Sequence, residues 1–134
     1  MNEEFKDISS VGFIRRTTAI YYRLFLQNLL PYGKKILYFD CDTIIYKDLS
    51  ELYNYNITDK YYTGHYEGPP IRKYGSNLNN FINSGVILIN LDNLRKDNIY
   101  TKIYEFLRNN NNRLLLLDKD AINVVCNKKK WIFT

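Results

Sequence analysis

Two carboxylates directly follow an apolar run in the segment KKILYFDCDTIIYKDL, where Asp40 and Asp42 are two residues apart. Side chains at i and i+2 of an extended segment point the same way, roughly 6 to 7 Å apart along the chain, so both can reach one ion while Cys41 points into the core. Clustered carboxylates repel unless a cation lies between them. Mg²⁺ or Mn²⁺ typically binds one or two such groups and completes its shell with water and phosphates. The pattern therefore predicts a metal site at a strand end.

The same Asp pair has two other interpretations. Asp42 and Thr43 can simply cap a turn, and the spacing alone leaves that interpretation open beside the metal site. Haloacid-dehalogenase-like phosphatases also place Asp-x-Asp after a buried strand, with the first Asp as nucleophile. Their pattern requires a Thr or Val at the fourth position after that Asp, usually preceded by Gly, whereas this chain has Thr43 and Ile44 there.

Apolar spacing predicts the elements that position the pair. A helix over residues 18–30 ends at Pro31 and Gly33, and the continuous apolar run 35–39 predicts a strand covered on both faces. One helical turn is expected at 48–52, a short strand at 60–63 and a long loop over 64–80.

The second half of the chain predicts another strand and two more helices. The segment FINSGVILINL predicts a buried strand over 86–91, entered through an Asn-Ser-Gly turn. Asp97 can cap a helix whose apolar positions are Ile99, Ile103, Phe106 and Leu107. After a loop at 109–112 and a short buried run at 114–117, a last helix starts at Asp118 or Asp120. Alternating strands and helices indicate an α/β fold with a mostly parallel sheet, in one domain over residues 1–134.

Composition restricts the class of protein. With 134 residues, 46% hydrophobic and 25% charged, the chain can form one globular core. No apolar stretch approaches the roughly 20 residues of a spanning helix, and the polar start predicts no signal peptide, so we expect a cytoplasmic protein with reduced cysteines. The net charge of +5 comes with only short basic clusters, at 15–16 and 128–130, and does not predict a nucleic-acid partner. Its remaining consequence is a mild preference for anionic ligands such as a diphosphate.

Three segments in order carry a family resemblance: AIYYRLFLQNLLPYGKKILYFDCDTIIYKDLSELY, FINSGVILINLDNLR and LLLLDKDAINVVC. Together they resemble the family 8 glycosyltransferases, the group that includes glycogenin and bacterial lipopolysaccharide galactosyl- and glucosyltransferases. The resemblance covers roughly residues 17–134. It implies a GT-A fold, a Rossmann-like mostly parallel sheet with flanking helices. It also implies a UDP-hexose donor, Mn²⁺ or a similar ion such as Mg²⁺, a glycan or lipid-linked saccharide acceptor, and retention of anomeric configuration.

The resemblance also implies roles for particular residues. Asp40 and Asp42 match the family's Asp-x-Asp, which holds the ion bridging the donor's phosphates, and Asp40 also lies near the sugar. Arg23 matches an Arg of the donor site. The other matched sugar-binding positions are Glu67, Asn83, Ser84, Gly85 and Asp118.

One matched position departs from the family. Lys119 stands where the family usually has a Gln whose amide lies close to the anomeric carbon, and together with Asp118 it occupies the catalytic segment DKDAIN. An ammonium has no acceptor oxygen, so we expect it to oppose a developing oxocarbenium charge unless the side chain turns away.

The resemblance further implies a uracil-binding strand before residue 17 and a metal-binding His beyond Thr134. Residues 1–16 predict no such strand, so the chain resembles the middle of a glycosyltransferase domain. The functions left open are hexosyl transfer and a non-catalytic remnant that binds a sugar or a protein partner.

Overall fold

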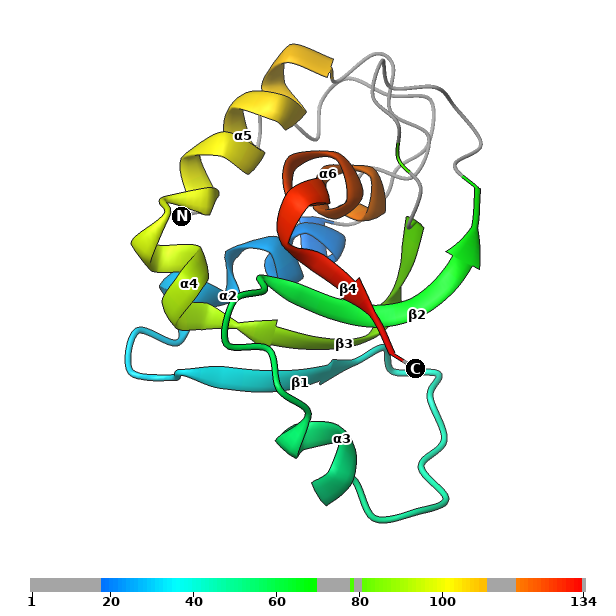
Figure 1. Ribbon diagram of the computed structural model, residues 1–134. Coiled ribbons are helices and arrows are strands. Elements are labelled where there is room, and N and C mark those ends of the chain that lie inside the picture. Colours follow the sequence, from blue (N-terminus) through cyan, green and yellow to red (C-terminus); the bar gives the residue numbers. More distant parts are fainter. Residues whose placement is uncertain (1–17, 70–77, 79–80, 111–117, 134) are drawn as a thin grey trace.

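A computed structural model describes residues 18–69, 78, 81–110 and 118–133 of the chain (Figure 1). The described helical elements and strands follow in this order: η1 (Thr18–Phe25), α2 (Leu26–Leu29), β1 (Lys35–Phe39), α3 (Ser50–Asn54), β2 (Tyr62–Gly68), β3 (Phe81–Asn90), α4 (Leu91–Lys96), α5 (Ile99–Asn110), α6 (Asp118–Val125), η2 (Asn127–Lys129) and β4 (Lys130–Ile132). The predicted buried run at 114–117 lies outside the described residues.

The described strands form one mixed sheet in the order β1-β3-β2-β4. β3 pairs antiparallel with both β1 and β2, whereas β2 and β4 are parallel. The expected mostly parallel pairing is therefore wrong in this part of the sheet, although the α/β class is right. β1, β2 and β4 run in one direction. β3 lies between β1 and β2 and runs in the opposite direction, since it starts at the end of the sheet where β2 finishes.

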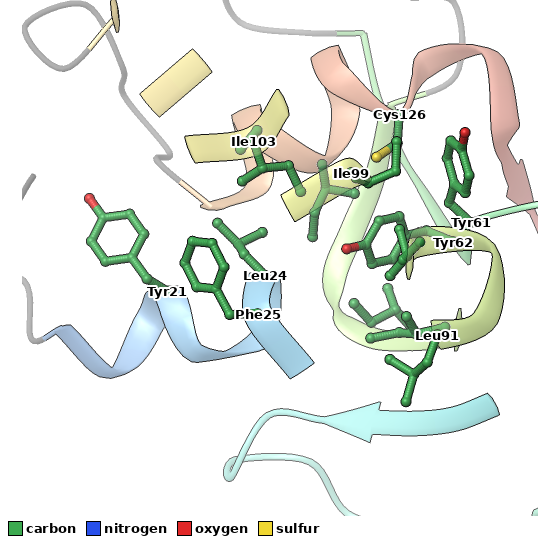
Figure 2. Close-up of a cluster of buried hydrophobic side chains, with 14 of the residues drawn as sticks. Tyr21, Leu24, Phe25, Tyr61, Tyr62, Leu91, Ile99, Ile103 and Cys126 are labelled. Atoms are coloured by element: carbon green, nitrogen blue, oxygen red, sulfur yellow. The ribbon is translucent and has the colours of Figure 1, made fainter. Parts of the chain in front are cut away.

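The core lies between one face of the sheet and the helices α2, α4, α5 and α6, whereas α3 lies on the opposite side (Figure 1). Figure 2 shows Leu24 and Phe25 of η1 pointing toward Ile103 of α5. All three side chains are at most 2% exposed. Residues four apart on α5, Ile99 and Ile103, share the buried face of that helix, so its predicted amphipathic pattern is confirmed.

Strand β1 has the predicted bounds but not the predicted burial. All five of its residues are only half-buried, because β1 is an edge strand of the described sheet and not a strand covered on both faces. The segment after it is a turn, closed by a 3.1 Å hydrogen bond from the Thr43 amide to the Asp40 carbonyl. Cys41 is exposed in this turn, so the expectation that it points into the core is wrong. The buried Cys126 directly follows α6 and is a free thiol, as expected.

The first part of the predicted long loop, 64–68, and the predicted Asn-Ser-Gly turn are both strand, whereas residues 70–77, 79 and 80 of that loop lie outside the described residues. β2 continues to Gly68, and β3 begins at Phe81, five residues before the predicted start. Gly64 pairs with Ile87, yet Tyr66 pairs with Ile82, so two steps along β2 match five along β3. The extra residues of β3 form a bulge between Ile82 and Ile87, and a bulge reorients side chains at a sheet's rim.

The helices end and begin partly as predicted. The helix predicted over 18–30 is helical from Thr18 to Leu29, although its first eight residues have 3₁₀ geometry. Asp97 does not cap α5. It ends α4, a helix absent from the prediction, and its carboxylate pairs with Lys129 at 2.7 Å and accepts a hydrogen bond from Tyr61.

Candidate functional site

Asp40 is fixed where β1 leaves the sheet. Its amide donates a 2.8 Å hydrogen bond to the Gly85 carbonyl, which continues the pairing of β1 with β3 one residue past the strand. Its carbonyl then accepts the hydrogen bond that closes the turn to Thr43. Both backbone groups of Asp40 are therefore satisfied, and its carboxylate is held at the edge where the β3 bulge lies.

Arg23 of η1 joins this carboxylate to the rest of the site. Its Nη2 lies 2.8 Å from Asp40 Oδ1, and its Nη1 donates to the Ser84 carbonyl at 2.8 Å and to Ser84 Oγ at 3.2 Å. Its Nε lies 3.2 Å from Asp118 Oδ2, without the alignment of a hydrogen bond. One guanidinium thus faces two carboxylates and holds η1, β1, β3 and α6 together.

Asp118 begins α6 and is the most buried carboxylate of this cluster, with 8% of the residue exposed. Ser84 Oγ donates a hydrogen bond to its Oδ2 at 3.4 Å. Burial raises the pKa of Asp118, and the nearby Arg23 charge opposes that rise. The net direction is upward, so at this position the loss of hydration outweighs the ion pair.

Tyr38 supports Asp40 from within β1. Its hydroxyl donates a 3.0 Å hydrogen bond to Asp40 Oδ1, and its ring lies 4.7 Å from the Arg23 guanidinium carbon. Burial and the hydrogen bond to Asp40 both raise the pKa of Tyr38, so its hydroxyl stays a donor at neutral pH. Sequence analysis missed this residue, although its position two residues before Asp40 on one strand face was a usable signal.

The bulge places Gly85 beside both the Asn83 side chain and the Asp40 carboxylate. Asn83 Oδ1 accepts a 2.7 Å hydrogen bond from the Gly85 amide, which directs the Nδ2 donor away from the backbone. A Cβ atom at Gly85 would lie 3.0 Å from both Asn83 Oδ1 and Asp40 Oδ2. Glycine therefore allows the carboxylate to approach the strand closely.

Asn123 anchors the start of the bulge to α6. Its side chain accepts a hydrogen bond from the Ile82 amide at 2.8 Å and donates to the Ile82 carbonyl at 2.9 Å, as a neighbouring strand would. Lys130 Nζ donates to the carbonyl and to Oδ1 of Asn123, both at 2.9 Å. Burial lowers the pKa of Lys130 to about 8. Neither residue was predicted. Asn123 lies in the motif DKDAIN, which was a usable signal, whereas the charge of Lys130 gives no sign that it is buried.

Glu67 and Lys119, which are 52 positions apart, form an ion pair beside this cluster. Lys119 Nζ lies 2.7 Å from Glu67 Oε1, with 18% and 34% of the two side chains exposed. Lys119 therefore pairs with a carboxylate of the predicted sugar-binding set, and whether it faces the anomeric carbon stays a prediction.

Asp42 stands apart from the other predicted residues. It is exposed in the turn after β1, and within the described part of the chain no hydrogen bond or ion pair joins it to them. The described residues also contain no group of three or more His, Cys, Asp or Glu side chains that could hold a metal. Asp40 Oδ1 is engaged by Arg23 and Tyr38, and Asp40 Oδ2 lies beside Gly85. The two carboxylates, Asp40 and Asp42, are still the type of ligand that suits a hard cation which binds mostly water and phosphate.

Comparison with known proteins identifies the family of this chain. The family model described as glycosyl transferase family 8 matches residues 12–133. The chain belongs to glycosyltransferase family 8. This membership overturns the phosphatase interpretation of the Asp pair and agrees with the order of the three sequence motifs.

Relatives and solved structures agree with the family and the fold. The chain is 30% identical over 118 residues to a putative glycosyltransferase of Haemophilus influenzae, a match that covers 83% of this chain and 36% of that protein. It is 29% identical to general stress protein A of Bacillus subtilis over 118 residues, covering 81% and 41% of the two chains. The galactosyltransferase LgtC, solved with donor and acceptor sugar analogs, superposes with a TM-score of 0.82 at 22% identity, covering 97% and 49%.

These matches show a GT-A glycosyltransferase fold, and the chain spans less than half the length of the proteins it matches. Among the described residues, no helix combines the length and apolar character needed to cross a bilayer. The predicted cytoplasmic location stays a prediction.

Proposed function

We propose that this chain is a single partial catalytic domain of a retaining family 8 glycosyltransferase. It would bind a UDP-hexose and transfer the hexose to a glycan or lipid-linked saccharide. The observation that carries the proposal is the convergence of Arg23, Asp40, Ser84 and Asp118 from four separate elements. These residues were matched to the family's donor site from sequence alone, and the structure gathers them around one guanidinium.

The described contacts suggest what each residue would do. Arg23 would orient the two carboxylates through Nη2 and Nε, and its Nη1 is held by Ser84. Ser84 is 3% exposed and already binds Arg23, so it would position that side chain and contact the sugar little. Asn83 accepts the Gly85 amide hydrogen with its Oδ1, so its Nδ2 can donate to a sugar hydroxyl. Asp118 can accept a hydrogen bond from another hydroxyl.

Asp40 and Asp42 would hold a divalent cation, Mn²⁺ or Mg²⁺. Such an ion, when bound, neutralises negative charge on a departing diphosphate. The side chains of the chain itself supply orientation: Tyr38 and Arg23 hold Asp40 Oδ1, and the close approach to Gly85 fixes Asp40 Oδ2.

Calorimetric titration of UDP, with and without Mn²⁺, tests the proposal. We expect Mn²⁺-dependent binding to the unmodified chain and its loss in Asp40→Asn. Asp59→Asn is the matched control, because Asp59 is a 78% exposed carboxylate that pairs with Lys60 away from the site. Equal UDP binding by Asp40→Asn and the unmodified chain would refute the proposal.

The second candidate function is a remnant that binds without transferring sugar. The ammonium of Lys119 at the family's Gln position favours it. Release of UDP from UDP-glucose or UDP-galactose, measured with a coupled assay, separates the two candidates. Transfer predicts release that requires Asp40; the remnant predicts UDP binding without release.

A further inference from the structure

The Glu67–Lys119 ion pair lies at the Ile82 end of the bulge. The neighbours of Glu67 on β2, Tyr66 and Gly68, pair with Ile82 and Phe81, the two residues of β3 that precede Asn83. The Lys119 carbonyl accepts a 2.9 Å hydrogen bond from Asn123, whose side chain also clamps Ile82. The pair therefore links the end of β2 to the first turn of α6 at the point where the sugar-binding segment begins.

Each member of the pair masks the charge of the other. Lys119 follows Asp118 directly in α6, and without Glu67 its ammonium would be free to attract an anionic ligand. Without Lys119, Glu67 would add a carboxylate to a cluster in which one guanidinium already faces two. The two groups lie 2.7 Å apart, with 18% of the Lys119 side chain and 34% of the Glu67 side chain exposed. Their charges largely neutralise each other, and both groups can still form further hydrogen bonds.

We propose that Glu67 and Lys119 are a specificity-determining pair. Their paired charges make this part of the sugar-binding site electrically neutral, so that the site accepts an uncharged hexose and rejects a hexuronic acid. This inference rests on the proposed function. A sugar carboxylate would compete with Glu67 for Lys119, and it would be repelled by Glu67, Asp40 and Asp118. A neutral hexose offers hydroxyl groups that donate to Glu67 or accept from Lys119 without displacing either.

The test compares two probes, UDP-glucose and UDP-glucuronic acid, by calorimetry with saturating Mn²⁺ on the full chain. Glu67→Gln unmasks the Lys119 charge, so we expect the affinity ratio to shift toward UDP-glucuronic acid by about tenfold, equivalent to about 1.4 kcal/mol. Lys119→Gln unmasks Glu67 and should shift the ratio the opposite way. The double variant removes both charges and should return the ratio close to that of the unmodified chain.

Both side chains are partly exposed, and thermal melting of each variant checks that it folds. Glu67→Ala repeats the prediction without introducing an amide. If every variant binds UDP but the ratio in Glu67→Gln and Glu67→Ala is unchanged, the specificity inference is overturned and the proposed function stands. If the unmodified chain binds no UDP with Mn²⁺, both are overturned.

Discussion

Replacing Gly85 by Ala tests whether the close approach of Asp40 to the bulge matters for function. The added Cβ would lie 3.0 Å from Asp40 Oδ2 and from Asn83 Oδ1, and ordinary contact begins at 3.4 Å, so each oxygen must retreat by about 0.4 Å. The backbone itself accepts alanine, because Gly68 is the described glycine with positive φ. The cost is therefore confined to these two side-chain oxygens.

Neither oxygen can retreat freely. Asp40 Oδ1 is held by Arg23 at 2.8 Å and by Tyr38 at 3.0 Å, and Asn83 Oδ1 is held by the Gly85 amide at 2.7 Å. Overpacking of this kind typically costs about 1 to 3 kcal/mol. Metal–ligand distances tolerate only about 0.2 Å, so a displacement of about 0.4 Å exceeds what a metal-binding carboxylate can absorb.

We expect Gly85→Ala to weaken UDP binding in the presence of Mn²⁺ by at least about tenfold, and to lower the melting temperature by about 3 to 8 °C. Gly33→Ala is the matched control: its Cβ would lie 3.1 Å from Leu91 Cδ1, in the core and not at the site. It should destabilise the chain similarly and leave UDP affinity unchanged. Unchanged Mn²⁺-dependent UDP affinity in Gly85→Ala would refute the reasoning.

Two further variants test the Arg23 cluster and the buried Lys130 that binds Asn123. Arg23→Met leaves Asp40 and Asp118 without their shared cation, so we expect the free energy of unfolding in urea to fall by about 3 kcal/mol. A loss below about 0.5 kcal/mol would contradict the central role of Arg23. Burial lowers the pKa of Lys130 to about 8, below the ordinary lysine pKa of 10.5. Between these two values the unfolded chain holds a proton that the folded chain has released, so stability rises with pH in that window. Urea unfolding at pH 7.5, 9 and 10 should show this rise in the unmodified chain and a weaker one in Lys130→Met; equal slopes would contradict it.

Some elements were predictable because their pattern is local. The apolar run 35–39 gave β1 its bounds, and the spacing of Ile99, Ile103 and Leu107 gave the buried face of α5. Burial of β1 could not be predicted in the same way, because it depends on which strands lie beside it. The same apolar run suits a central strand and an edge strand.

The bulge was missed because Asn-Ser-Gly is a common turn sequence. Here its polar groups are satisfied from outside β3, by Arg23 on the Ser84 carbonyl and by the Asp40 amide on the Gly85 carbonyl. Partners 61 and 45 positions away give no local signal.

Strand β4 was missed for a similar reason. Lys130 begins it and is 4% exposed, and a lysine there suggests a surface until Asn123 is known to receive its ammonium.

The site residues were found through family motifs and not through spacing. Spacing placed Asp40 and Asp42 on one side of an extended segment, whereas the chain turns at Asp40 and leaves Asp42 exposed. Convergence of Arg23, Asp40 and Asp118 required the fold, and the Glu67–Lys119 pair required knowing that β2 extends past Thr63.

The central claim is that Asp40 helps to bind a divalent cation together with UDP. Free Mn²⁺ can be followed by electron paramagnetic resonance as UDP is added to the chain. We predict that chain and UDP together remove more free Mn²⁺ than the sum of each alone, and that Asp40→Asn abolishes this excess while Asp59→Asn retains it. An excess that survives in Asp40→Asn, or no excess in the unmodified chain, would contradict the claim.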